Sequence, residues 1–454
     1  MNKLTSLRTL SKALISNELG AAELAQQTLA RAKLSTSVFI ALNDALASQA
    51  NSIDEARNRG VTMPPLAGIP ISTKDLFNLK GEKTLAGSVV RRDLCAAEDE
   101  DAEVIKPLRE AGLLFAGRTN MSEFAFSGMG KNPHYGTPPS IWDRKTGRLP
   151  GGSSSGSAVS VAEGIVVATL GSDTAGSCRI PAAFNGIVGV KPSYGRLSLT
   201  GIYPLSPTSD APGPLAHDVD SCYLLDQLMS GRLSPSAPLP ALETPSNESL
   251  KLVVPQSGVL DGLDEEVQKA FNQSLDALRA SGARVIEADM SSIDDCIDMF
   301  AKRPVVIHEA YHHHRQMLEQ YGDLYDPFVQ QRILTGADIS DQEQLTRYQE
   351  KARIIELFNQ QFRATGCDAL LYPTVSCIPP AIAETGDFDN ACAVNLRCLR
   401  NTATANYFDG CSISLPCHKK ATAPVGLMLS AMNGDDDSLY RISAAVESVI
   451  KQIR

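Results

Sequence analysis

The sequence predicts an α/β protein in which helices cover a β-sheet. Two stretches show helix-like and strand-like patterns in alternation. A helix-like run, Ala158 to Glu163, precedes an apolar run, Ile165 to Leu170, that is typical of a buried strand. Farther along the chain, strands are predicted at Leu250 to Pro255 and Arg284 to Asp289, on either side of a helix from Glu265 to Ser281. Such alternation is typical of a sheet with helices packed on it.

Helical patterns also fill the beginning of the chain. Two helices separated at Gly20 are predicted up to Leu34, and a third is predicted from Ala45 to Arg59. The first helix carries an apolar stripe of leucines at Leu4, Leu7, Leu10 and Leu14. Asp101 to Gly112 has a helical pattern that Pro107 interrupts, and Leu113 to Ala116 is predicted to be a short strand.

The second half begins after a stretch rich in proline and serine, residues 231–248, which lacks periodicity and is predicted to be a linker loop. Residues 290–366 are predicted to be mostly helical, and Asp437 to Arg454 forms a closing amphipathic helix. Three further strands are expected, at Cys367 to Thr374, Cys411 to Pro416 and Val425 to Ser430.

Composition excludes several classes of protein. The chain has 454 residues, of which 43% are hydrophobic and 21% charged, as in ordinary globular proteins. Its net charge of −10 argues against nucleic-acid binding. It contains no run of 18 apolar residues and no signal-peptide core, so no membrane association is expected. Its ten cysteines are scattered without a C-x-x-C pair, which favours free thiols in the cytoplasm.

Two clusters of small residues stand out, Gly151 to Ser157 and Thr174 to Ser177. Backbone without bulky side chains can approach a ligand closely and direct its N–H groups at it. A phosphate-binding loop would need Lys and Ser or Thr after the glycines, where Ala158 and Val159 stand instead. Acyl transfer by a serine is the chemistry that remains. The alternative is a surface loop, since turns favour Gly and Ser.

A lysine upstream favours the chemical interpretation. Lys74 ends a short apolar strand that begins near Leu66. Most lysines lie on the surface, but burial disfavours the charged form and lowers the pKa, so that a buried lysine can act as a base. A serine nucleophile needs such a base because its hydroxyl is weakly nucleophilic.

Together, Lys74, the G-G-S-S-S-G-S cluster and the segment D-T-A-G-S-C-R-I-P resemble the amidase signature family of Ser-Ser-Lys amide hydrolases. The family pattern places a second serine 24 positions after the first serine of the cluster, and Ser153 and Ser177 have this spacing. The similarity is concentrated between Gly68 and Ser206. One departure is Ala175, where the family commonly has glycine; it is tolerated unless that position needs a positive φ.

The resemblance implies one domain over residues 1–454, with a large mixed β-sheet covered by helices on both faces. Its parts would be N-terminal helices (1–62), a catalytic core (63–230), the linker loop (231–248) and a C-terminal α/β part that carries specificity (249–454). The implied catalytic residues are Ser177 as nucleophile, Ser153 as bridge, on a cis peptide in the family, and Lys74 as base. The implied oxyanion and substrate-binding residues are Thr174, Ala175, Gly176, Ala125, Ser127 and Gly128.

The implied reaction hydrolyses a small-molecule carboxylic amide to acid plus ammonia or amine, without a metal or other cofactor. A homodimer is compatible with this function. The alternative is the glutaminase component of a tRNA-dependent amidotransferase complex, in which the same residues release ammonia for a partner chain.

Several other polar residues in these segments admit two interpretations. Arg179 and Asp210 either orient the site or form a structural ion pair elsewhere. Cys178 follows the proposed nucleophile, but no histidine is near in sequence to activate it. Three consecutive histidines, 312–314, do not share a helix face and lack matching Asp, Glu or Cys spacing, so no metal site is expected.

Overall fold

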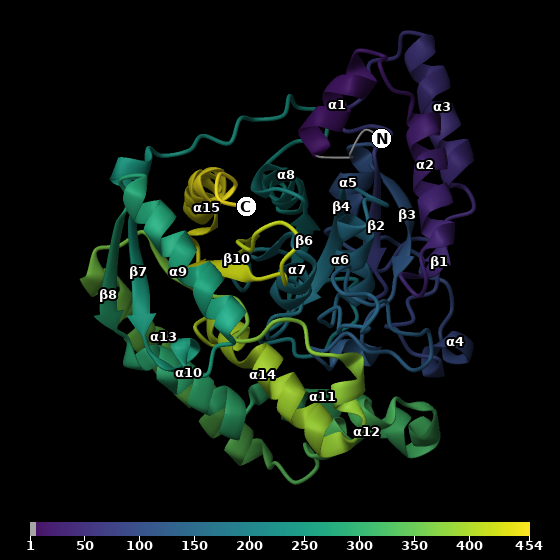
Figure 1. The fold of residues 1–454 in the computed structure, drawn as a ribbon. Coiled ribbons are helices and arrows are strands. Elements are labelled where there is room, and N and C mark those ends of the chain that lie inside the picture. Colours follow the sequence, from purple (N-terminus) through teal and green to yellow (C-terminus); the bar gives the residue numbers. More distant parts are fainter. Residues whose placement is uncertain (1–5) are drawn as a thin grey trace.

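An 11-stranded mixed sheet runs through the computed structural model, which describes residues 6–454 (Figure 1). The strands are β1 (Phe39–Leu42), β2 (Pro70–Lys74), β3 (Leu114–Thr119), β4 (Ala168–Asp173), β5 (Val188–Lys191), β6 (Ala211–Ala216), β7 (Lys251–Gln256), β8 (Arg284–Asp289), β9 (Ala369–Pro373), β10 (Cys411–Pro416) and β11 (Gly426–Ala431). Their order is β1-β3-β2-β4-β6-β5-β10-β11-β9-β7-β8. β2 is parallel to β3 and β4, and β7 is parallel to β8 and β9, whereas the other neighbouring pairs are antiparallel.

Helices pack on this sheet. They are α1 (Leu7–Ile15), α2 (Ala21–Leu34), α3 (Leu46–Asn58), α4 (Val90–Leu94), α5 (Lys106–Glu110), α6 (Ser155–Ala162), α7 (Arg179–Asn185), α8 (Val219–Met229), α9 (Glu265–Ala280), α10 (Ser291–Lys302), α11 (Val305–Tyr321), α12 (Pro327–Leu334), α13 (Asp341–Thr365), α14 (Phe388–Tyr407) and α15 (Asp436–Ile450). α6 and α7 contact each other and central strands, as do α8 and α15. Every residue of β4 and β10 is buried, which requires cover on both faces. The predicted fold class is confirmed.

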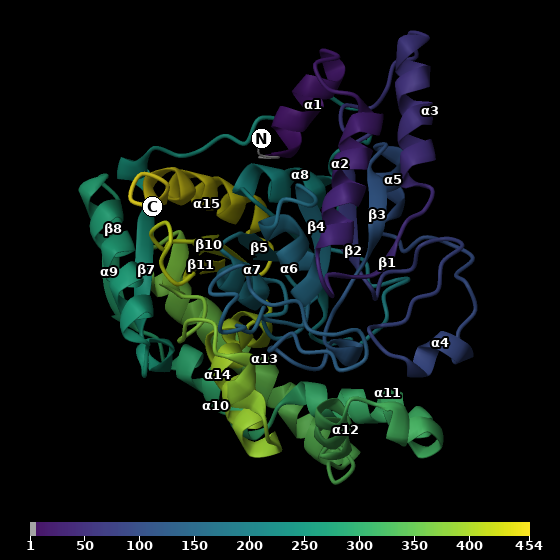
Figure 2. The same ribbon diagram turned by 45° about the vertical axis from the view of Figure 1, so that its right-hand side comes forward.

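The N-terminal helices flank one end of the sheet. Figure 2 shows α2 and α3 beside β1, at the side opposite β8. Leu7, Leu10 and Leu14 form the buried stripe of α1, as predicted. Leu4, the fourth member of the predicted stripe, lies outside the described residues.

Two predicted elements have different bounds. The strand expected at Ile165 to Leu170 begins only at Ala168. The N–H groups of Ile165 and Val166 donate instead to the carbonyl of Ser160, in the turn that follows α6. The helix expected from Asp101 to Gly112 is limited to α5. Pro107 lies in its first turn, where a missing N–H costs nothing, so it marks the start of the helix instead of interrupting it.

The longest unpredicted element is α14, at residues 388–407. Its buried face carries amides, hydroxyls and small residues, such as Asn395, Asn401 and Thr402, so no apolar period marks it. Residues 290–366 contain α10 to α13, which confirms the predicted helical region. All ten cysteines are free thiols. None of the helices within residues 6–454 combines the length and the apolar character needed to span a membrane.

Candidate active site

The three predicted reacting residues come from three segments that meet at one edge of the sheet. β2 and β4 are parallel neighbours, with Thr73 opposite Leu170, so both strands end on the same side. Lys74 is the last residue of β2, and Ser177 lies in the loop between β4 and α7. Ser153 lies two residues before the start of α6, which contacts both strands. The topology therefore brings Lys74 together with two serines that lie 79 or more positions later in the chain.

Lys74 is completely buried and has two hydroxyl partners. Its Nζ lies 2.7 Å from Ser153 Oγ and 2.7 Å from Ser172 Oγ. Burial lowers the pKa of Lys74 to about 8, because the ammonium form loses its hydration. Ser172 was not predicted as a site residue. Its signal was its position in β4, which leads into residues 174–178, the loop that carries the predicted nucleophile Ser177 (the nucleophile loop).

Ser153 is held by its backbone. The Gly152–Ser153 peptide bond is cis. The Ser153 carbonyl accepts a hydrogen bond from Ser122 N–H at 3.1 Å, and Gly152 N–H donates to the Gly128 carbonyl at 2.8 Å. These contacts fix the segment so that the Ser153 hydroxyl faces Lys74.

Ser177 lies next to this segment. Its carbonyl accepts a hydrogen bond from Ser154 N–H at 3.3 Å. Within residues 6–454, its hydroxyl makes no hydrogen bond, to Ser153 Oγ or to any other group, and the residue lines a small cavity. Hydrogen bonds of catalytic groups are often long or unformed before substrate binds. The Ser177 hydroxyl thus has no partner among the described residues, although the residue itself is buried.

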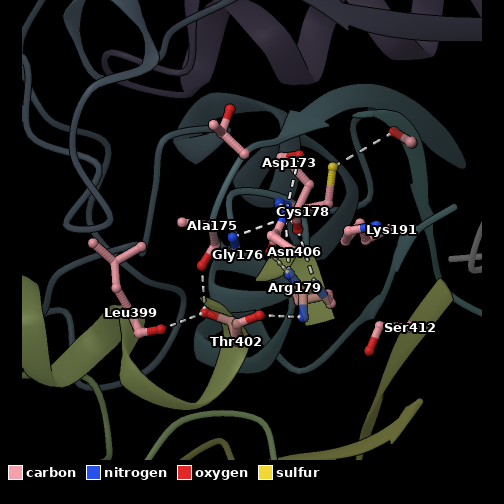
Figure 3. A network of polar contacts seen from close by, with 12 residues as sticks. Asp173, Ala175, Gly176, Cys178, Arg179, Lys191, Leu399, Thr402, Asn406 and Ser412 are labelled. Carbon is pink, nitrogen blue, oxygen red and sulfur yellow. Dashed lines mark hydrogen bonds and ion pairs between the residues drawn. The ribbon is translucent and has the colours of Figure 1, made fainter. Parts of the chain in front are cut away.

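An ion pair between Asp173 and Arg179 supports the nucleophile loop. Asp173 accepts hydrogen bonds from Gly176 N–H at 2.8 Å and from Cys178 N–H at 3.1 Å. Arg179 binds the same carboxylate and reaches α14 through Asn406 Oδ1 at 2.7 Å (Figure 3). Burial alone would raise the pKa of Asp173, but the guanidinium holds this pKa below its ordinary value. Arg179 therefore orients the loop, which is one of the two interpretations offered by the sequence. It does so through Asp173, a partner that sequence reasoning missed.

Asp210 contacts the other end of the loop. It accepts a hydrogen bond from Thr174 Oγ1 at 2.5 Å and further bonds from the N–H groups of Leu205 and Ser206. Burial raises the pKa of Asp210 to about 6. Asp210 and Arg179 do not pair with each other, and each holds a different part of the same loop.

Gly176 has a conformation that other residues rarely adopt. Its φ is +136°, and a Cβ at this position would lie 2.0 Å from Thr402 Oγ1. Thr402 in turn donates a hydrogen bond to the Ala175 carbonyl at 2.7 Å. Ala175 itself does not have a positive φ, so alanine fits at the position where the resembled family has glycine.

The predicted substrate-binding residues Ala125, Ser127 and Gly128 line the same small cavity as Ser177. Ala125 has a φ of +61°, a left-handed conformation that is uncommon for alanine. Gly128 N–H and the Ser127 hydroxyl both donate to Asn395 Oδ1, at 2.8 and 3.3 Å. Asn395 lies on the unpredicted helix α14, so sequence reasoning could not have found it.

Two cavities adjoin here. The inner one, with a volume of about 30 Å³, contains Ser177 and is lined by Ala125, Phe126, Ser127, Gly128, Thr174, Ala175, Leu205, Phe300, Val306, Arg332 and Leu399. The outer one has a volume of about 380 Å³ and shares Ser127 with the inner one. Asp326, Phe328 and Phe388 are among its lining residues.

The structure bears on two further predictions, one for Cys178 and one for the three consecutive histidines. Burial raises the pKa of the Cys178 thiol far above its ordinary value, so this residue is unsuited to be a nucleophile.

The expectation that no acidic residue matches the histidines needs correction. Among the described residues, His308, His312 and Asp341 have ligand atoms within 4.8 Å of one another. His308 and His312 share a face of α11 one turn apart, and Asp341 begins α13.

Comparison with known proteins gives a consistent result. The family model described as Amidase matches residues 21–440. The chain is 32% identical to 2-amino-5-chloromuconic acid deaminase of Comamonas testosteroni, over 89% of this chain and 86% of that protein. It is 30% identical to one component of the glutamyl-tRNA(Gln) amidotransferase of Cupriavidus metallidurans, over 98% of this chain and 97% of that protein. A crystal structure of an amidase superposes with a TM-score of 0.86 at 32% identity, covering 98% of this chain and 99% of the other.

Proposed function

The chain belongs to the amidase family and is a hydrolase of carbon–nitrogen amide bonds; we propose that Ser177, Ser153 and Lys74 carry out this hydrolysis. The observation that carries the proposal is the 2.7 Å contact between Lys74 Nζ and Ser153 Oγ in a fully buried setting. The Ser177 hydroxyl, which faces the inner cavity without a partner, is the group left free to attack a substrate.

In the first half of the reaction, neutral Lys74 takes a proton from Ser153 while Ser153 takes one from Ser177. The lowered pKa of Lys74, about 8, supports this role because an appreciable fraction is neutral near pH 7 to 8. The Ser177 oxygen then attacks the amide carbonyl and forms a tetrahedral intermediate. The proton returns through Ser153 to the leaving nitrogen, so that the C–N bond breaks and an acyl-enzyme remains.

The oxyanion is held by backbone N–H groups of the nucleophile loop. Those of Thr174, Ala175 and Ser177 have no hydrogen-bond acceptor in the described part of the chain. The predicted contribution of Gly176 is revised, because its N–H already donates to Asp173. Gly176 contributes the sharp backbone conformation that aims its neighbours at the cavity.

Deacylation uses the same groups. A water molecule replaces the departed nitrogen, gives its proton through Ser153 to Lys74, and attacks the acyl carbon. When the bond between the acyl carbon and the Ser177 oxygen then breaks, the proton returns from Lys74 through Ser153 to that oxygen. The products are a carboxylic acid, ammonia or an amine, and the regenerated Ser177 hydroxyl. Every step is a proton transfer or an acyl transfer between groups of this chain, substrate and water.

A second candidate is the glutaminase part of an amidotransferase. It is favoured by the alignment with a glutamyl-tRNA(Gln) amidotransferase component over nearly the full length of both chains. The two candidates differ in whether the chain acts alone. Hydrolysis of simple amides by the purified chain favours the free-standing enzyme, whereas strict dependence on a partner chain favours the second candidate.

The proposal is tested by replacing Ser177 with alanine. We expect kcat/KM for amide hydrolysis to fall by on the order of 10⁴-fold or more, because the nucleophile is lost. Ser153→Ala is expected to lose less, since a water molecule can relay the proton. Cys178→Ala is the matched control, because it changes the adjacent buried side chain and should keep activity. Near-normal turnover by Ser177→Ala, with loss in Cys178→Ala, would reassign the nucleophile.

A further inference from the structure

Arg332 lines the same inner cavity as the proposed nucleophile. It lies in α12 and is partly buried, whereas Ser177 lies in the loop that follows β4. The remaining walls are mostly apolar, formed by Leu205, Phe300, Val306 and Leu399. A cationic residue and the proposed nucleophile therefore share one largely apolar cavity. The role of Arg332 in binding substrate, argued below, rests on the proposed function of Ser177.

The charge of this guanidinium is not neutralised by the protein. Among residues 6–454, no carboxylate forms an ion pair with Arg332. One of its five N–H groups donates to the Phe126 carbonyl. Its remaining contacts are aromatic, with the ring centroid of Phe126 at 4.3 Å and that of Phe328 at 5.6 Å. The aromatic faces orient the guanidinium but supply no counter-charge.

This arrangement differs from those of the other buried arginines near the site. Arg179 is paired with Asp173, and Arg118 is paired with Asp75. Burial lowers the pKa of Arg332 to about 10, because no nearby carboxylate compensates for lost hydration. A partly buried, unpaired charge is unfavourable, and an anion entering the cavity would relieve it.

We propose that Arg332 binds a carboxylate on the acyl part of the substrate, which makes the substrate class the monoamides of short dicarboxylic acids. A guanidinium fork matches a carboxylate in geometry and charge. The apolar residues that line the same cavity suit a methylene spacer, and the cavity volume of about 30 Å³ favours a short one. Hydrolysis of such a compound releases ammonia and the dicarboxylate.

The first test compares succinamate with its neutral counterpart succinamide. We expect the wild-type enzyme to prefer succinamate, and Arg332→Gln to lose about 10- to 100-fold in kcat/KM for succinamate alone. Arg332→Lys should retain part of the preference. Arg353→Gln, which alters an exposed arginine of α13, is the matched control. An equal loss for both amides would overturn the proposal, because it would mean that Arg332 only supports Phe126.

The second test does not depend on turnover. In the Ser177→Ala background, succinamate should bind more tightly than succinamide in titration calorimetry, and adding Arg332→Gln should remove the difference. Equal binding of the two compounds would overturn the inference even if amide hydrolysis is established. If neither compound is hydrolysed but the binding preference is present, the proposed reaction fails while the carboxylate site stands. Preference for amides with a carboxylate on the amine side would also overturn it.

Discussion

Asp173 and Arg179 form a completely buried ion pair with two hydrogen bonds, Nη2–Oδ1 at 2.8 Å and Nε–Oδ2 at 3.0 Å. The carboxylate also accepts the N–H groups of Gly176 and Cys178, on both sides of Ser177. One pair of side chains therefore fixes the backbone of the nucleophile loop and connects it to the core.

Breaking this pair should destabilise the fold and impair turnover together. Asp173→Asn leaves the Arg179 charge buried without a partner, and we expect the free energy of unfolding to fall by about 3–5 kcal/mol. Arg353→Ala is the comparison, because it removes an exposed ion pair with Asp295 and should cost at most about 1 kcal/mol. Urea unfolding measures both. Equal losses in the two variants would contradict a special role of the buried pair.

The pH dependence of kcat/KM should show an acid limb with a midpoint near the Lys74 pKa of about 8. Activity rises with pH because the neutral amine is the base. Lys74→Ala should remove this limb and cost several orders of magnitude in rate. Lys191 provides the matched control, because burial lowers its pKa to about 8 as well, although it donates to the carbonyls of Pro192 and Gly410. An acid limb that persists in Lys74→Ala but disappears in Lys191→Met would assign the base elsewhere.

The same shift affects stability. Because the pKa of folded Lys74 lies below its unfolded value of 10.5, the unfolded chain binds the proton first as the pH falls. The destabilisation from this group therefore grows between about pH 10.5 and 8 and is fully present below that range. In Lys74→Met, stability should depend less on pH across this window, and urea unfolding at a series of pH values measures the difference.

Chelators should leave the activity unchanged. Each proposed step uses only groups of Lys74, Ser153, Ser177 and the loop backbone. The group formed by His308, His312 and Asp341 does not line the inner cavity, so a metal ion bound by these residues should not affect turnover. The measurement is kcat/KM before and after dialysis against EDTA, with His308→Ala in parallel. Loss of activity that zinc restores in wild type, but not in His308→Ala, would contradict the proposed mechanism.

The three residues proposed to react could be selected from the sequence because short segments carry them. The spacing of Ser153 and Ser177 and the strand-end position of Lys74 can be recognised locally. The fold class also follows from alternating patterns, which the parallel pairs β2–β4 and β7–β8 confirm. The bounds of strands were less predictable. Ile165 and Val166 have the apolar character of a strand, but their N–H groups bond to the end of α6, so β4 begins later.

The supporting contacts were beyond sequence reasoning because they join distant segments. Asn395, Thr402 and Asn406 all lie on α14, whose buried face is polar and small and so lacks an apolar period. Their partners are Gly128, Ala175 and Arg179, which lie more than 200 positions earlier. The match between Asp341 and His308 likewise depends on two helices meeting, which residue spacing along one chain does not show.

The late position of α14 has a consequence for the order in which the enzyme is made. A ribosome releases the segments carrying Lys74, Ser153 and Ser177 long before residues 388–407 emerge, and chains fold from the N-terminus as they are synthesised. The contacts of Thr402 with Ala175 and of Asn406 with Arg179, and the pairing of β10 with β5, form only after residues 388–416 have been made. A nascent chain that ends before α14 therefore holds all three proposed reacting groups without the support that positions them, and we expect hydrolytic capability only after α14 and β10 have been made.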